Sequence, residues 1–227
     1  MFLSRHRQYH VSGHPSPAYR LHSDSEPHPS KTPKQPADPA MVRTLLSQAS
    51  SVSIPKHSRL SALRRLRGLA RDSEKNRSVI SAHNAREVLL AIVFSNTDSD
   101  SCELNHEALA VLAMFPLSES ECAFVSFDPE RITYLVSLLF HSSIEVRVNS
   151  AALIEIVLAG TRSSEIRAQI SNGDEIFEGI VGILNCPLAY PRALKVGIKA
   201  LGIFTAAWAC VKELGLSGDW QGLCSSN

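Results

Sequence analysis

A cluster of arginines near residue 60 is the first group of side chains in this sequence that could do chemistry. The segment Arg59–Ile80 carries seven basic residues among twenty-two, and guanidinium groups bind phosphates or peptide carboxylates. Three of the arginines repeat at the spacing of one helix face and form a candidate basic surface: Arg64, Arg67 and Arg71. The alternative is a solvated helix face whose arginines pair with the nearby acids Asp72 and Glu74. The net charge of +1 favours this alternative, so we expect no nucleic-acid partner.

A second polar group lies near the start of two later apolar segments. Asn105 and Asn149 each precede an Ala-Leu pair by three residues, and asparagine amides can hydrogen-bond the backbone of a bound peptide. Glu145 and Arg147 are close to Asn149 in the sequence. We take these four residues as a candidate partner-binding groove. The alternative is that the two asparagines are helix-start residues on a polar face.

Residue patterns typical of metal sites and catalytic centres are missing or incomplete. Three histidines have the four-residue spacing of metal ligands on a helix: His6, His10 and His14. Gly13, Pro15 and Pro17 disfavour a helix there, so we expect no metal site. The five cysteines are widely spaced, odd in number and without a Cys-x-x-Cys pair, which favours free thiols over disulfides or zinc. No catalytic residue or cofactor is indicated, because no G-x-S-x-G, P-loop or H-E-x-x-H motif is present.

Composition divides the chain into an arm and a folded region. Residues 1–40 hold seven of the twelve prolines and five of the nine histidines, whereas the chain from Met41 onward is rich in Leu, Ile, Val and Ala. We expect a disordered arm and linker over 1–39, a folded domain over 40–206 and an irregular tail over 207–227. With no secretory signal and no apolar run long enough to span a membrane, the sequence predicts a soluble chain in the cytoplasm or nucleus.

An internal repeat organises the folded region. Ala-Leu pairs begin at Ala62, Ala108, Ala152 and Ala200, at intervals of 46, 44 and 48 residues. A second apolar landmark follows the first three of these alanines by 32 residues each, at Phe94, Phe140 and Leu184. Three helices in a unit of this length are typical of armadillo and HEAT repeats. The repeat predicts an all-α, armadillo-type right-handed α-superhelix of about three to four repeats, with a concave groove.

The repeat also predicts where the helices lie. We expect helices over 40–50 and 58–71, followed by units over 73–116, 118–160 and 162–206. Pro129 and Pro191 stand where helices should begin, and Gly173 where a short helix should end. The third unit shows no polar capping helix, which leaves three apolar residues uncovered and favours self-association: Ile198, Leu201 and Phe204.

Three stretches resemble a known family. The run "TPKQPADPAMVRTLLSQAS" (Thr32–Ser50) resembles the segment that joins the U-box to the armadillo region in plant U-box ubiquitin ligases. "ALRRLRGLARDSEKNRSVI" (Ala62–Ile80) resembles their first armadillo stretch, and "YPRALKVGIKAL" (Tyr190–Leu201) resembles a later one. The resemblance implies that the armadillo groove binds a protein substrate or a kinase regulator, while the U-box binds a ubiquitin-charged E2.

Residues 1–31 match none of the features that the resemblance implies for a U-box, such as an Ile-Cys-Pro-Ile-type start. We therefore expect an E2 partner only if a U-box lies upstream, and no ubiquitin transfer by this chain alone. Two functions stay open: the partner-binding part of a U-box ligase, and a non-catalytic armadillo adaptor or decoy. A nucleic-acid-associated scaffold that uses the Arg59–Arg71 face is a third and weaker alternative.

Overall fold

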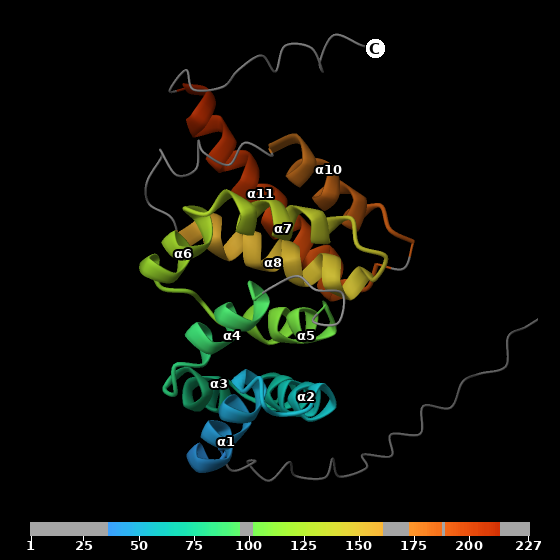
Figure 1. Cartoon of the computed structure of the whole chain (residues 1–227). Helices are drawn as coiled ribbons and strands as arrows, with labels where there is room; N and C mark the ends of the chain where they lie inside the picture. The colour runs from blue at the N-terminus through green and yellow to red at the C-terminus, as the bar shows by residue number, and fades with distance from the viewer. Residues whose placement is uncertain (1–35, 96–101, 161–172, 188, 214–227) are drawn as a thin grey trace, which may run out of the picture. The chain divides into compact units, whose positions relative to one another are not determined.

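The structure is a computed structural model that describes residues 36–95, 102–160, 173–187 and 189–213, with side chains described as far as residue 206. The chain divides into two units, Met1–Gln35 and Pro36–Asn227, and every described helix lies in the second. All regular secondary structure in the described residues is helical (Figure 1). The expected all-α class is confirmed.

Ten helices are described. They are α1 (Pro39–Ser50), α2 (Lys56–Asp72), α3 (Glu74–Ser81), α4 (Ala85–Val93), α5 (Cys102–Leu112), α6 (Glu119–Ser126), α7 (Pro129–Leu139), α8 (Ile144–Gly160), α10 (Gly173–Leu184) and α11 (Pro191–Glu213). The first two correspond to the helices expected over 40–50 and 58–71. Gly173 begins α10, while the short helix expected before it lies outside the described residues, and α11 continues past residue 206.

Short-range sequence signals explain where several helices begin. Asp38 accepts a hydrogen bond from the backbone N–H of Ala40 at 3.0 Å, and Pro39 occupies the first turn of α1. Asp128 and Pro129 repeat this arrangement at α7. α6 begins with a capping box, in which Ser118 and Glu121 each accept a hydrogen bond from the other's backbone N–H.

A buried asparagine on α3 ties the start of the folded unit to α2. The Oδ1 atom of Asn76 accepts a 2.8 Å hydrogen bond from the backbone N–H of Ala37, while its Nδ2 donates to the carbonyl of Leu69 at 3.0 Å. The side chain is buried with both ends of its amide paired, which satisfies a polar group that would otherwise be costly to bury. Asn84 connects α3 to α4. Its φ of 53° is left-handed and produces a sharp turn before α4.

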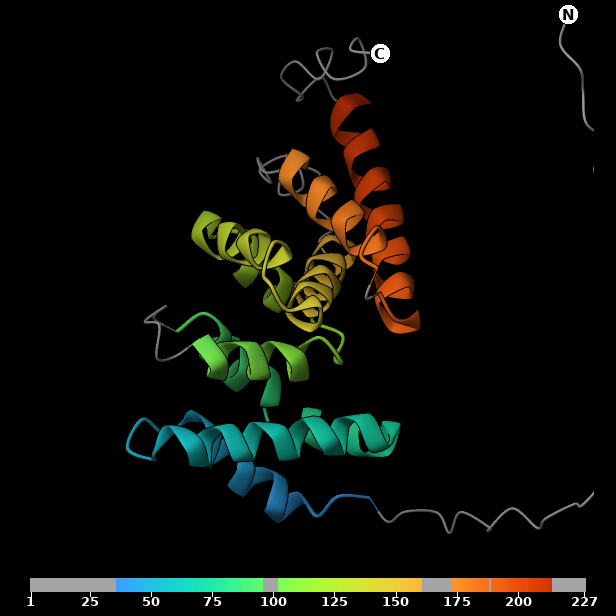
Figure 2. The ribbon, with the colours of Figure 1, turned by 90° about the vertical axis from the view of Figure 1, so that its right-hand side faces the viewer.

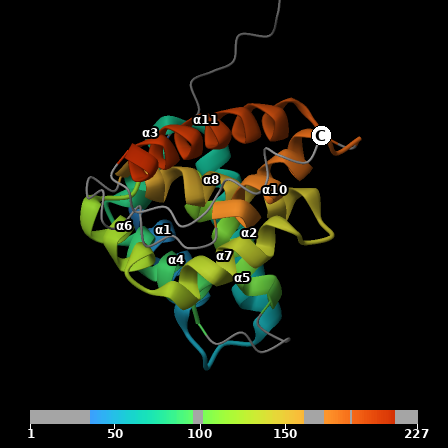
Figure 3. The same cartoon turned by 90° about the horizontal axis from the view of Figure 1, so that it is seen from above.

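Four helices form one continuous layer, and three of them, α2, α8 and α11, are the longest helices described. α2, α5, α8 and α11 follow one another along the stack (Figure 2), and each packs against the next. We call these four the third-helix layer. α11 lies alongside α8 when the unit is seen from above (Figure 3). One apolar core runs between the helices from Ala37 to Phe204, and its largest fully buried side chains include Leu63, Leu109, Leu135, Leu153 and Ile180.

The C-terminal end of the layer corrects one expectation. Ile198 is 65% exposed and Leu194 39% exposed, as expected for an uncovered face. Phe204, however, is only 4% exposed and belongs to the core, and Leu201 is partly buried against it. The helical period places the buried and exposed residues on different faces of α11. Phe204 lies one turn after the buried Ala200, whereas Leu194 and Ile198 share another face.

In the part of the chain that the structure describes, no helix is long and apolar enough to cross a membrane.

Candidate functional site

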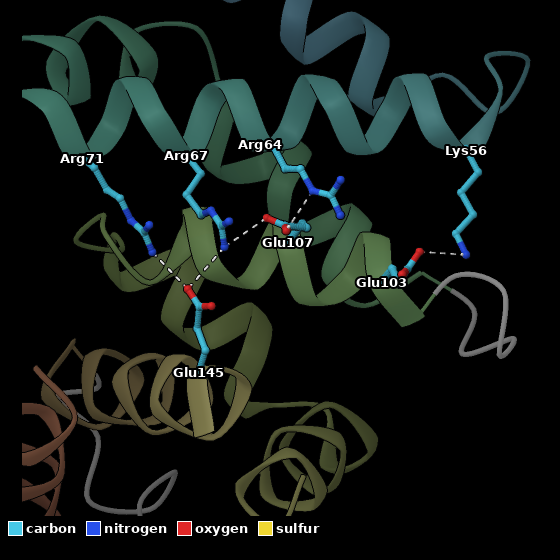
Figure 4. A network of polar contacts seen from close by, with 7 residues as sticks. All are labelled: Lys56, Arg64, Arg67, Arg71, Glu103, Glu107 and Glu145. Carbon is cyan, nitrogen blue, oxygen red and sulfur yellow. Dashed lines mark hydrogen bonds and ion pairs between the residues drawn. The ribbon is translucent and has the colours of Figure 1, made fainter. Parts of the chain in front are cut away.

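Four basic side chains of α2 point toward three glutamates on the next two helices of the third-helix layer (Figure 4). The pairs are Lys56–Glu103, Arg64–Glu107, Arg67–Glu107 and Arg67–Glu145, each at 3.3 Å, and Arg71–Glu145 at 3.0 Å. Glu103 and Glu107 belong to α5 and Glu145 to α8. The candidate basic surface is therefore part of an ion-pair network that links three helices.

The partners of these arginines differ from those that the sequence indicated. We expected pairing with nearby acids such as Asp72 and Glu74, yet Arg64, Arg67 and Arg71 pair with glutamates 40 to 78 positions away. The reason is that α2 packs along α5, so the arginines lie on the face of α2 that meets the following repeats. The arginines thus form a helix face paired with acids, as expected, and the acids that pair with Arg64, Arg67 and Arg71 are Glu107 and Glu145.

The network is least exposed around Glu107 and Arg67 and more open at Glu145. The side chain of Glu107 is 15% exposed and that of Arg67 is 23% exposed, whereas Glu145 is 44% exposed. Among the described residues, Oε2 of Glu107 has no directed hydrogen bond, so its 3.3 Å contact with Arg67 is an ion pair without good hydrogen-bond geometry. Breaking the Glu107 end leaves charges with little water around them, while the Glu145 end can exchange with solvent or a ligand.

Both asparagines are buried, which contradicts the alternative that placed them on a polar face. Asn105 and Asn149 are each 1% exposed. The Oδ1 atom of Asn149 accepts a 3.2 Å hydrogen bond from Arg192, and Asn105 hydrogen-bonds the side chain of Tyr134. A residue three positions before a buried alanine shares its helix face, which is why both asparagines turn inward.

The hydrogen bond to Asn105 also affects the phenol of Tyr134. Burial raises the pKa of Tyr134 above its usual value, and the hydrogen bond from Asn105 acts in the opposite direction. Asn105 therefore connects α5 to α7, and Asn149 connects α8 to α11. Each amide is already used between helices, although Asn149 also lines a small hollow beside the ion-pair network.

Arg147 faces away from Glu145. Its Nε donates a 2.9 Å hydrogen bond to the carbonyl of Leu139 at the C-terminus of α7. Arg59 makes the same type of contact, donating to the carbonyl of Ala49 at 2.9 Å near the end of α1. Each arginine satisfies a helix-end carbonyl of the preceding helix. The four residues expected to form one groove thus make four separate contacts, and Glu145 is the one that takes part in the ion-pair network.

A large hollow lies next to Glu145. It has a volume of about 930 Å³ and brings together the ends of several helices. We call it the arginine cleft, and its lining is Ala70, Arg71, Arg77, Ala113, Met114, Ser143, Ile144, Glu145, Tyr190 and Arg192. The smaller hollow shares Ser143 and Glu145 with it and is also lined by Arg64 and Arg67. The two hollows therefore follow the same face of the third-helix layer.

Two arginines of the cleft were missed by sequence reasoning. Arg77 lies on α3 and donates a 3.0 Å hydrogen bond to the carbonyl of Ala70, and Arg192 is the second residue of α11. No periodic pattern marks either residue. The proline before Arg192 marks a helix start, but the local sequence does not indicate that this start meets α2 and α3.

A pair of histidines lies close to the smaller hollow. The rings of His106 and His141 have centroids 4.7 Å apart, and Sγ of Cys102 is 3.4 Å from Nε2 of His106. Burial, assisted by the nearby His141, lowers the pKa of His106 below its usual value. Within the described residues, no group of three or more His, Cys, Asp or Glu side chains could hold a metal ion. His6, His10 and His14 lie outside those residues.

Comparison with known proteins places these features in a family context. The family model for the plant U-box protein ARM repeat region matches residues 41–217. U-box domain-containing protein 26 of Arabidopsis thaliana is 54% identical over 175 residues, which cover 75% of this chain and 42% of that protein. U-box domain-containing protein 25 of the same plant is 54% identical over 174 residues, covering 75% of this chain and 41% of that protein. The match thus spans less than half the length of these curated relatives.

Solved structures support the same fold. A crystal structure of an engineered protein aligns with a TM-score of 0.50 at 22% identity, covering 77% of this chain and 68% of the other. A second engineered protein aligns with a TM-score of 0.50 at 21% identity, covering 72% of this chain and 37% of the other. At this level of identity the likeness shows the fold alone.

Proposed function

Because the chain belongs to the ARM-repeat family of plant U-box proteins, we propose that its third-helix layer binds a protein that is a substrate or regulator of ubiquitination. Armadillo repeats are generally protein-interaction modules. The observation that carries the proposal is the arginine cleft, about 930 Å³ in volume, which continues into a second hollow on the same face. Its lining mixes apolar side chains such as Met114 and Tyr190 with charged groups, as peptide-binding surfaces require.

The proposed role in ubiquitination rests on proximity. A U-box ligase holds a charged E2 beside its substrate, so the gain in rate comes from positioning the two reactants. In this scheme the residues of this chain perform no covalent step. They hold the partner, and the buried ion pairs and asparagines keep neighbouring repeats in register so that the binding face stays rigid.

Affinity capture with variants of the intact chain tests the binding face. Wild-type protein is incubated with plant extract, and bound proteins are quantified by mass spectrometry. Met114→Glu and Tyr190→Ala change the cleft, while Phe127→Ala removes an aromatic side chain that is 63% exposed and lies outside the hollows. We expect partners lost in both cleft variants and kept by Phe127→Ala. Retention of every partner by both cleft variants contradicts the proposed face.

The link to ubiquitination needs a second measurement. A captured partner is followed in plant cells that express an excess of this chain, and its ubiquitin conjugates are quantified against cells that express Tyr190→Ala. We expect the wild-type chain to change the level of conjugates and Tyr190→Ala to change it less. An unchanged level with the wild-type chain contradicts a role in ubiquitination and favours a plain adaptor.

A further inference from the structure

We propose that the arginine cleft recognises an acidic segment of the protein partner, with closely spaced Asp or Glu carboxylates. The inference rests on the proposed function and specifies the chemistry of the partner. Three guanidinium groups line the cleft, those of Arg71, Arg77 and Arg192, and among its described lining residues the only carboxylate is that of Glu145. The lining therefore carries a formal excess of two positive charges (three minus one) in a chain whose net charge is only +1.

Two of the three arginines are held in place by acceptors that do not cancel their charge. Arg77 donates to the carbonyl of Ala70 at 3.0 Å, and Arg192 donates to the amide oxygen of Asn149 at 3.2 Å. Both acceptors are neutral. A guanidinium group has five N–H donors, so each arginine is oriented by one bond and keeps others for a ligand. This preorganisation reduces the entropy lost on binding.

Glu145 shows how this surface accepts a carboxylate. Its Oε1 atom lies 3.0 Å from Nη2 of Arg71 and 3.3 Å from Nη1 of Arg67, and its side chain is 44% exposed. An incoming carboxylate can take the same position at Arg71 or add to it on the open side. Glu145 therefore acts as an internal competitor of an acidic ligand, and its removal is expected to strengthen binding instead of weakening it.

The apolar part of the lining defines the rest of the ligand. Ala113, Met114, Ile144 and Tyr190 line the same cleft and are partly buried. The charges come from α2, α3 and α11 and are spread around a cavity of about 930 Å³. This distribution suits an extended segment with several separate carboxylates and an apolar residue more than a single compact anion.

Fluorescence anisotropy with synthetic peptides tests the proposal on the full chain. The probe is a labelled twelve-residue peptide of Asp, Glu, Leu and Gly, and its control has Asn and Gln in place of every acid. We expect the acidic peptide to bind at least about tenfold more tightly than the amide peptide, with affinity falling between low and moderate salt. Equal binding of the two peptides, or no binding of either, overturns the proposal without using any variant.

Substitutions then locate the site. Arg77→Gln and Arg192→Gln should each weaken binding of the acidic peptide by about three- to tenfold, as loss of about 1 kcal/mol predicts. Arg65→Gln is the matched control, because Arg65 is exposed on α2 and does not line the cleft, and it should change affinity by less than about twofold. Thermal unfolding of each variant checks that it is folded. If Arg65→Gln weakens binding as much as the cleft variants do, the attraction is nonspecific and the proposal fails.

Glu145→Gln separates the competitor role of Glu145 from a structural role, because a residue that only stabilises the fold would not tighten peptide binding when it is replaced. We expect it to bind the acidic peptide about two- to fivefold more tightly than wild type, while unchanged or weaker binding contradicts the competitor model. Two further probes define the ligand class. A peptide with one phosphoserine that binds when the acidic peptide does not, or an RNA that competes through the same arginines, overturns the assignment to an acidic segment. Failure with these peptides, together with partner loss in Met114→Glu and Tyr190→Ala, leaves the proposed function intact and removes this inference alone.

Discussion

Glu145 at the start of α8 accepts a 3.0 Å hydrogen bond from Arg71 at the end of α2, across 74 positions of sequence. The two helices are separated in the third-helix layer by α5, whose Glu107 pairs with Arg64 and Arg67. Ion pairs therefore link α2 to both α5 and α8, which belong to the next two repeats. Farther along the same layer, Lys199 on α11 lies 3.0 Å from Glu155 on α8.

The two glutamates that pair with the arginines of α2 should contribute unequally to stability. Glu107→Gln is expected to lower the free energy of unfolding by about 1–2 kcal/mol, because it removes a charge from a poorly solvated pair. Glu145→Gln should cost less than about 1 kcal/mol, since that carboxylate is 44% exposed and its pairs are screened. Urea denaturation at low and high salt measures both. Equal losses, or a salt dependence confined to Glu107→Gln, would show that the exposure of the two side chains does not decide their contributions.

Two helical glycines should respond in opposite directions to the same substitution. A Cβ atom at Gly179 on α10 would lie 2.6 Å from Cβ of Leu139 on α7, whereas a Cβ atom at Gly68 on α2 meets nothing within 4 Å. Gly179→Ala should therefore destabilise the chain by about 1–3 kcal/mol through overpacking. Gly68→Ala should stabilise it by about 0.5–1 kcal/mol, because alanine has the higher helix propensity. Chemical denaturation of the two variants gives the signs directly, and a stabilising Gly179→Ala contradicts the close packing of α7 and α10.

The free energy of unfolding should fall as the pH is lowered, because His106 is harder to protonate in the folded chain than in the unfolded chain. Its folded-state pKa is lowered, first by burial and then by His141, with Glu103 acting in the opposite direction. Above the unfolded-state value of about 6.5, His106 is neutral in both states and contributes no pH dependence to stability. Below that value the unfolded chain binds a proton more readily than the folded chain, so stability is lost as the pH falls toward the folded pKa.

Substitution of His106 isolates this effect from the other titrating groups. Denaturation midpoints of wild type and His106→Gln are compared at pH 7.5, 6.5 and 5.5. The difference between them should change in favour of His106→Gln as the pH drops. A constant difference over this range means that His106 titrates alike in the folded and unfolded chains.

The uncovered face of α11 should promote self-association. Leu194 and Ile198 lie one turn apart on α11 and are 39% and 65% exposed. Apolar side chains grouped on one face favour contact with a second apolar surface. We expect sedimentation velocity to show concentration-dependent association, which Ile198→Lys shifts to about tenfold higher protein concentration. A monomer that is insensitive to dilution contradicts this expectation.

The sequence by itself determined the repeat, the helical class and the family. Apolar spacing along a helix and capping residues such as Asp38 and Ser118 act over a few positions, so they can be recognised without knowledge of the fold. The 46- and 44-residue intervals between the Ala-Leu pairs reflect a core that is rebuilt in each unit. The resemblance to plant U-box proteins, first indicated by three short stretches, is confirmed by the match over residues 41–217.

Only the tertiary structure decided which polar groups meet. The inward position of Asn105 and Asn149, the separation of Arg147 from Glu145, and the approach of Arg77 and Arg192 depend on how successive helices cross. Helix faces are local, but their neighbours come from other repeats, and a ligand-binding cavity is the space left between them. The arginines were therefore recognisable as one helix face from the sequence, while their glutamate partners and the cleft beside them required the packed stack.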